Sequence, residues 1–182
     1  TYGVVSMYAK LGKRTGEQKY TDAALAAAEF RWQTYGTKAV YLGSTGGVDV
    51  ADKESGMLNM DAFLTLYELN GDRKWLDRAC AAADYTESWI WIWNVPMPVG
   101  ADPDDLGWKP GVNTIGVNGI GSNDVGGVDQ YLDWAVPHYA KLYKYTGDEH
   151  YLDVARILLH GTKAMLAITG RTYDLDGTGW KK

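Results

Sequence analysis

A motif that occurs three times constrains the fold of this chain more than any other feature. The copies read LGKRTGEQKYTDAA from Leu11, LYELNGDRKWLDRA from Leu66 and LYKYTGDEHYLDVA from Leu142. Each has a Leu, a Gly five residues later, an acidic residue directly after the Gly, an aromatic residue three positions further, and then Asp and Ala. Self-similarity of this kind is typical of a repeated supersecondary unit.

Each position of the motif has a mechanical role in a helical hairpin. The Gly ends one helix, because the left-handed cap conformation costs little only without a Cβ. The acidic residue lies near the N-terminus of the next helix, where negative charge is favourable. The aromatic residue and the Ala are expected on the buried face of that helix. Copy by copy, these residues are Gly16, Glu17, Tyr20 and Ala23; Gly71, Asp72, Trp75 and Ala79; Gly147, Asp148, Tyr151 and Ala155.

The apolar periodicity on both sides of each motif predicts an all-α fold built from antiparallel helical hairpins. The turn glycines at positions 16, 71 and 147 are much further apart than the ~34 residues of a short solenoid repeat. Long connections, roughly over 34–55 and 94–127, therefore separate the hairpins. Loops of this length in a compact domain commonly carry function. We expect one domain over residues 1–182.

The succession of helix, short TGD-type turn, Tyr-Leu-Asp-x-Ala helix and long loop resembles the hairpin unit of the six-hairpin glycosidases and N-acylglucosamine-epimerase-like proteins. The resemblance covers nearly the whole chain. It implies an (α/α)6 toroid in which the helix before each turn lies in an inner ring and the helix after it in an outer ring. The expected inner helices are roughly 2–12, 57–69 and 127–145, and the expected outer helices are roughly 18–34, 73–92 and 149–168.

A full toroid of this kind needs about six hairpins, and the motif predicts three. An open half-ring would expose apolar flanks. We therefore expect a fragment of a longer catalytic domain, because Thr1 begins inside a predicted helix and Tyr173 to Lys182 resembles the start of another long loop. The alternative is a homodimer that closes the ring between two copies. In either case this chain alone is predicted to be inactive.

Carboxyl groups on the loop face are the expected catalytic groups, because most glycosidases use two carboxyls that flank the bond, one protonated and one ionised. Asp124 and Asp129 flank the entry to the third expected inner helix, and Glu54 lies near the entry to the second. These three are the predicted catalytic residues; the competing interpretation of the two aspartates is helix capping. Asp61 and Asp133 are predicted to be ordinary helix acids. The predicted sugar-binding residues are Trp108, Trp134, Tyr131, Asn123 and Gln130.

Composition excludes several other classes of function. The net charge of −5 and the scattered basic residues argue against a nucleic-acid partner. No apolar stretch approaches the ~20 residues of a membrane helix. Cys80 is the single cysteine, and the histidines lack metal-ligand spacing, so neither a metal nor a cofactor is expected. The expected partner is a carbohydrate, and a secreted or periplasmic bacterial origin is implied by the resemblance alone.

Three functions compete. Glycoside hydrolysis, with one loop-face carboxyl as acid and another activating water, is the leading hypothesis; lysis ranks lower. A sugar epimerase or isomerase of the same shape would need a His acid or base at the inner-helix ends. Only His138 lies in a predicted inner helix, about three turns from its start, so this hypothesis fits poorly. The third hypothesis is a non-catalytic helical scaffold that binds a glycan or a protein.

Overall fold

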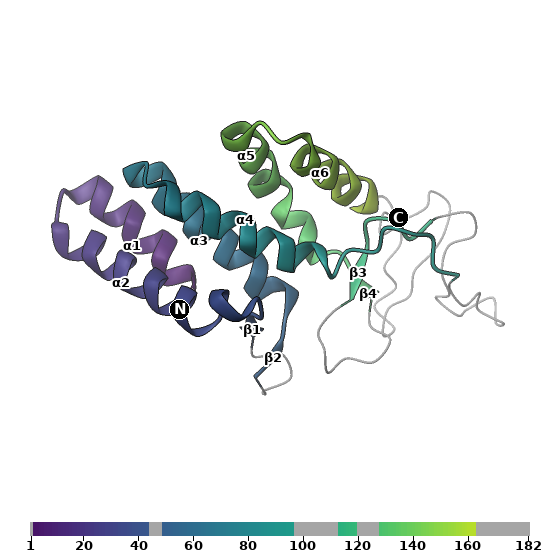
Figure 1. Cartoon of the computed structure of the whole chain (residues 1–182), viewed down its shortest axis with the longest axis horizontal. Coiled ribbons are helices and arrows are strands. Elements are labelled where there is room, and N and C mark those ends of the chain that lie inside the picture. The colour runs from purple at the N-terminus through teal and green to yellow at the C-terminus, as the bar shows by residue number, and fades with distance from the viewer. Residues whose placement is uncertain (1, 44–48, 97–112, 120–127, 163–182) are drawn as a thin grey trace, which may run out of the picture.

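The described part of this computed structural model comprises residues 2–43, 49–96, 113–119 and 128–162, and it is mostly helical. Three antiparallel hairpins lie side by side, with α3–α4 between the other two (Figure 1). They are α1 (Tyr2–Thr15) with α2 (Gln18–Thr34), α3 (Lys53–Asn70) with α4 (Arg73–Glu87), and α5 (Val136–Thr146) with α6 (Glu149–Gly161). The predicted all-α class and the hairpin at each motif are confirmed.

The hairpin turns have the backbone geometry that the motif predicts. Gly16, Gly71 and Gly147 adopt φ of 74°, 70° and 75°, the left-handed region that favours glycine. The amides of Gly71 and Gly147 close the preceding helices by bonding to the carbonyls of Tyr67 and Tyr143, each at 2.8 Å. The acid that follows in these two copies is the N-cap of the next helix. Asp72 accepts from Lys74 N and Asp148 from His150 N, both at 3.0 Å.

The core is centred on α3, which packs against α1, α4 and α5. From Lys53 to Leu66 nearly every side chain of this helix is buried. Phe63 stacks on Trp75 of α4 with ring centroids 6.0 Å apart. Small residues at the predicted motif position let helices approach closely, since Ala79 and Ala155 are buried as expected. In the first copy Ala24 takes that position and is fully buried, whereas the predicted Ala23 is half-buried.

The helix boundaries depart from the predictions in several places, and α1 continues to Thr15 rather than 12. The helix predicted over 127–145 is not continuous: Val128–Asp129 form strand β4, Tyr131–Ala135 form the 3-10 helix η3, and α5 begins only at Val136. Pro137 explains the late start, because a proline is tolerated in the first turn of an α-helix but not in its interior. The helix α3 begins at Lys53 rather than 57, because Asp52 caps it by accepting from Glu54 N at 2.8 Å.

The α4 helix ends at Glu87 rather than 92. The chain then extends, and Ile90 forms an isolated antiparallel bridge with Asn118 of strand β3 (Asn118–Gly119). Strand β3 pairs with β4, and strand β1 (Leu42–Gly43) pairs with β2 (Val50–Ala51), both antiparallel. A short 3-10 helix, η1 (Gly36–Lys38), links α2 to β1.

These short strands lie at the ends of the hairpins that are opposite the glycine turns, because β2 leads into α3 and β4 leads through η3 into α5 (Figure 1). They mark where the long connections enter the first helix of a hairpin. None of the helices in the described part of the chain combines the length and apolar character that crossing a bilayer requires.

Candidate functional site

A polar line runs along the otherwise buried helix α3. Between Lys53 and Leu66, the only residues that are not buried are Glu54, Leu58 and Asp61. Spacings of four and three residues place side chains on the same helix face. The next two positions at this spacing are Thr65, which is 7% exposed, and Glu68, which is exposed. Glu54, Asp61, Thr65 and Glu68 therefore lie on one face of α3. A second polar group of this helix, Ser55 and Asn59, faces α2, where both side chains accept from Arg31.

Matching lines lie on α1 and α5, the first helices of the other two hairpins. On α1 the line comprises Ser6, Lys10 and Lys13, and on α5 it comprises His138, Lys141 and Tyr145. We call the three lines together the central polar face, with these members: Ser6, Lys10, Lys13, Glu54, Asp61, Thr65, Glu68, His138, Lys141 and Tyr145. Contacts of α3 with both α1 and α5 bring them together.

Asp61 joins the three helices at the middle of this face. Its Oδ2 accepts a hydrogen bond of 2.6 Å from Ser6 Oγ on α1. Its Oδ1 lies 3.2 Å from Nε2 of His138 on α5. Since Ser6 gives its proton to Asp61, the 3.4 Å contact between the Ser6 and Thr65 hydroxyls has Thr65 as donor. The result is an ordered chain of polar groups from Thr65 through Ser6 to Asp61 and His138.

This arrangement sets the charge of Asp61. Burial alone would raise its pKa, but the hydrogen bonds from His138 and Ser6, together with the charges of His138 and Lys10, lower the pKa to about 2. Asp61 is therefore an anion at neutral pH. It can orient His138 or stabilise positive charge on a ligand, and it is poorly suited to donate a proton.

His138 is held through one ring nitrogen, Nε2. Its side chain is 18% exposed, and its Nδ1 is buried with no hydrogen-bond partner among the described residues. When Nε2 donates to Asp61, the neutral ring has a lone pair on Nδ1. The histidine lies in the first turn of α5, and not about three turns inside an inner helix as predicted.

At one end of the central polar face, Glu68 of α3 bonds to two residues of α5. The carboxylate lies 3.0 Å from Lys141 Nζ and accepts a 2.7 Å hydrogen bond from the Tyr145 hydroxyl. Burial would raise the pKa of Glu68, and the bonds from Tyr145 and Lys141 outweigh it, so the pKa is lowered. Glu68 is thus an ionised carboxylate that already has a cationic partner.

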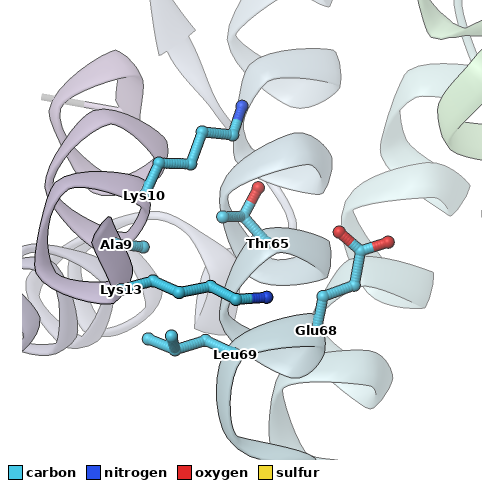
Figure 2. A pocket seen from close by; sticks show the side chains of 6 residues that line it. All are labelled: Ala9, Lys10, Lys13, Thr65, Glu68 and Leu69. Carbon is cyan, nitrogen blue, oxygen red and sulfur yellow. The ribbon is translucent and has the colours of Figure 1, made fainter.

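A cavity of about 220 Å³ opens beside Glu68 between α1 and α3. Figure 2 shows the lysine side chains of α1 extending across to α3 at this point. The lining residues are Ala9, Lys10, Lys13, Thr65, Glu68 and Leu69.

At the opposite end, the structure brings three of the predicted site residues to one region. Glu54, in the first turn of α3, has a carboxylate that is 38% exposed and lies 3.9 Å from Lys53 Nζ. Lys53 is fully buried, and its ammonium lies 5.9 Å from the ring of Tyr131. Tyr131 in turn stacks on Trp134, with ring centroids 5.5 Å apart and planes at 20°.

The two aromatic residues are accessible, since Tyr131 is 51% exposed and Trp134 is 68% exposed. They belong to η3 and continue the spacing of the α5 line, with Trp134 four residues and Tyr131 seven residues before His138. Large apolar rings on a surface commonly mark a binding site. Gln130, also predicted to bind sugar, is half-buried and precedes η3; its carbonyl accepts from Asp133 N at 2.9 Å.

The remaining predicted residues are not placed. Asp124, Asn123 and Trp108 lie outside the described residues. The backbone of Asp129 pairs with Asn118 in the β3–β4 ribbon, and its side chain lies outside the described part of the chain. The predictions for these four residues therefore stay predictions.

Sequence reasoning assigned Asp61 no role beyond that of a helix acid, whereas the structure gives it partners from two other helices. One signal could have identified it: Asp61 is the only charged residue in the strongly apolar stretch from Met57 to Leu66. A charge on a helix face that is otherwise buried needs a partner. Ser6 carries no comparable signal.

Among the described residues, no group of three His, Cys, Asp or Glu side chains is placed to hold a metal ion. A scan against protein-family models finds no match, and a search of curated proteins finds no significant relative.

Proposed function

We propose that this chain is part of a carbohydrate-active enzyme of the α/α-toroid type, most consistent with glycoside hydrolysis, and that the sugar binds over the central polar face. In this proposal α1, α3 and α5 belong to the inner ring. In the same proposal, the remaining hairpins of the ring belong either to the rest of a longer chain or to a second copy of this chain. The lines of polar side chains on these three helices support that assignment, because inner-ring helices must present polar groups to a ligand.

The observation that carries the proposal is the position of the exposed Tyr131–Trp134 pair relative to the acids of α3. Flat aromatic rings pack against the C–H surfaces of sugars, and these rings continue the line that leads to His138 and Asp61. Glu54 lies at the same end, next to Lys53, whose ammonium approaches the Tyr131 ring. Paired carboxyls are what most sugar hydrolases use, and an aromatic platform beside them gives the sugar ring a surface on which to pack.

The two acids would have different roles. Asp61, with a pKa of about 2, stays ionised and would stabilise the positive charge of the transition state or activate water. The proton donor must then be another carboxyl, and Glu54 and the predicted Asp124 and Asp129 are the candidates. Glu54 and Asp61 are separated by two helical turns, or about 10 Å along the axis.

Sugar binding by this chain tests the proposal without requiring a complete ring. We expect neutral oligosaccharides to quench tryptophan fluorescence, and Trp134→Ala to remove binding. Phe30→Ala is the matched control, because Phe30 is a similarly exposed aromatic residue on α2 and lies outside the central polar face. If no oligosaccharide binds, or if both variants bind equally well, the assignment of the site is wrong.

Hydrolysis is tested on the ring-complete protein. Asp61→Asn and Glu54→Gln should each lower kcat by about 10²-fold or more while leaving sugar affinity within a few-fold, as expected for general acid–base and electrostatic roles. Unchanged kcat in both variants would exclude these two acids. Binding without any cleavage would favour the non-catalytic scaffold.

A sugar epimerase or isomerase is the second candidate, and the His138–Asp61 pair favours it. A His oriented by a carboxylate is a suitable base for removing the proton next to a sugar carbonyl. Incubation of reducing sugars with the ring-complete protein in D₂O would reveal exchange of that proton by NMR. Exchange that His138→Gln abolishes would support this candidate, and the absence of exchange would exclude it.

A further inference from the structure

The cavity between α1 and α3 differs in charge from the protein as a whole. The chain has a net charge of −5, yet two ammonium groups, those of Lys10 and Lys13, line this cavity. Neither lysine forms an ion pair with a carboxylate within the part of the chain that the structure describes. The cavity therefore contains positive charge that a ligand could neutralise.

The one carboxylate in the lining does not cancel this charge. Glu68 is bound by Lys141 and Tyr145 from α5, on the side away from α1. Lys13 extends from α1 toward the space between Thr65 and Leu69, and Lys10 extends past Thr65 in a direction away from Lys13 (Figure 2). Ala9 and Leu69 add an apolar wall. Two cations, an apolar wall and a paired carboxylate make a pocket suited to a small ligand that carries an anionic group.

A chain of side-chain contacts links the cavity to Asp61. Thr65 lines the cavity and also contacts Ser6, the residue that donates to Asp61. Lys10 contributes to the lowered pKa of Asp61, so its charge lies near that carboxylate. Since the Thr65 proton is used by Ser6, its oxygen can accept from a ligand hydroxyl. Ser6 and Lys13 are two turns apart on α1, about 10 Å along the axis.

We propose that this cavity binds the anionic group of a charged sugar, a carboxylate or a phosphate, with Lys10 and Lys13 as its ion partners and the sugar ring extending toward Asp61. The inference rests on the proposed carbohydrate function, and it narrows the substrate class from sugars in general to acidic sugars. Discrimination comes from charge: a neutral sugar would leave both ammonium groups unpaired, and an acidic sugar would not.

Binding of three probes to this chain tests the inference: D-glucuronate for the carboxylate, D-glucose 6-phosphate for the phosphate, and D-glucose as the neutral reference. We expect at least one acidic sugar to bind about tenfold or more tightly than glucose. Lys10→Gln and Lys13→Gln should each weaken its binding about three- to tenfold, and the double variant should lose the preference over glucose. The stronger of the two acidic probes identifies the anionic group.

Lys38→Gln is the matched control, because Lys38 is an exposed lysine of η1 that does not line the cavity. It should leave all three affinities unchanged. Added salt should weaken the binding of the acidic sugar to the wild-type protein more than to the double variant. The inference is overturned if neither acidic sugar binds more tightly than glucose, or if the double variant retains the preference.

The outcomes separate this inference from the proposed function. Neutral oligosaccharides that bind through Trp134, with no preference for acidic sugars, would contradict the lysine pocket and leave the sugar site standing. Inorganic phosphate that binds at Lys10 and Lys13, with no binding of any sugar, would contradict the carbohydrate function and with it the acidic-sugar substrate.

Discussion

Asp61→Asn is the substitution whose effect on stability follows most directly from the structure. Asp61 connects α3 to Ser6 of α1 and His138 of α5, and its pKa is lowered from 3.8 to about 2. One pKa unit corresponds to about 1.36 kcal/mol, so this shift represents up to about 2.4 kcal/mol. Because the carboxylate is 25% exposed, solvent screening reduces the expected contribution to about 1–2 kcal/mol.

The pH dependence of this contribution has a defined sign. A pKa that is lower in the folded than in the unfolded state stabilises the protein at pH values above the unfolded pKa. The stabilisation by Asp61 is therefore fully present above pH 3.8 and is lost as the pH falls through about 2. The difference in unfolding free energy between wild type and Asp61→Asn should be present at about pH 5 and should shrink as the pH falls through about 2.

Urea unfolding followed by circular dichroism measures this difference. Asp77→Asn is the matched control: Asp77 also pairs with a basic residue, at 2.9 Å from Arg73, but its side chain is 61% exposed. The Asp77→Asn substitution should change the free energy of unfolding by less than about 0.5 kcal/mol. Equal stability of wild type and Asp61→Asn near neutral pH, or a difference that persists unchanged in acid, would refute the reasoning.

Three further substitutions test the packing and the second acid–histidine pair. Leu64 of α3 is fully buried in the core, so Leu64→Ala should lower the free energy of unfolding by about 2–5 kcal/mol. Urea titrations measure this loss, and a value below ~1 kcal/mol would contradict the central place of α3 in the core. Gly161→Ala would drive a methyl group into the Gly116 backbone, so its thermal midpoint should fall by several degrees; an unchanged midpoint would mean that α6 and this segment do not pack closely. His150 donates a hydrogen bond of 2.7 Å to Glu87, and this bond raises the pKa of His150. The stability that His150→Gln removes should therefore be greatest below about pH 6 and should vanish as the pH rises above the raised pKa. Urea titrations of wild type and His150→Gln, from below about pH 6 to above the raised pKa, test this prediction. A stability loss that stays the same over this pH range would be inconsistent with the His150–Glu87 pair.

The local structure of each hairpin could be predicted from the sequence because the signals act over a few residues. A glycine in the left-handed conformation ends the first helix, and the acid behind it caps the second, as Asp72 and Asp148 do. Neither requirement depends on what the helix packs against. The late start of α5 also has a local cause, Pro137, which the periodicity alone did not reveal.

The candidate site was predicted in part for the same reason. Tyr131, Trp134 and Glu54 were identified by residue type and by their positions near helix entries, and the structure places all three at one end of the central polar face. Local signals in the sequence are thus sufficient for the helices and their turns, and the sugar-binding and catalytic roles of Tyr131, Trp134 and Glu54 stay predictions.

Which polar side chains meet depends on the packing of the helices against one another. Ser6 lies 55 residues from Asp61, and their contact depends on how α1 packs against α3. The lowered pKa of Asp61, its pairing with His138 and the cavity at Lys10 and Lys13 all arise from that packing. Side-chain spacing predicts the face of a helix on which a residue lies, but the partner across the interface depends on the relative position of two helices, which no local signal encodes.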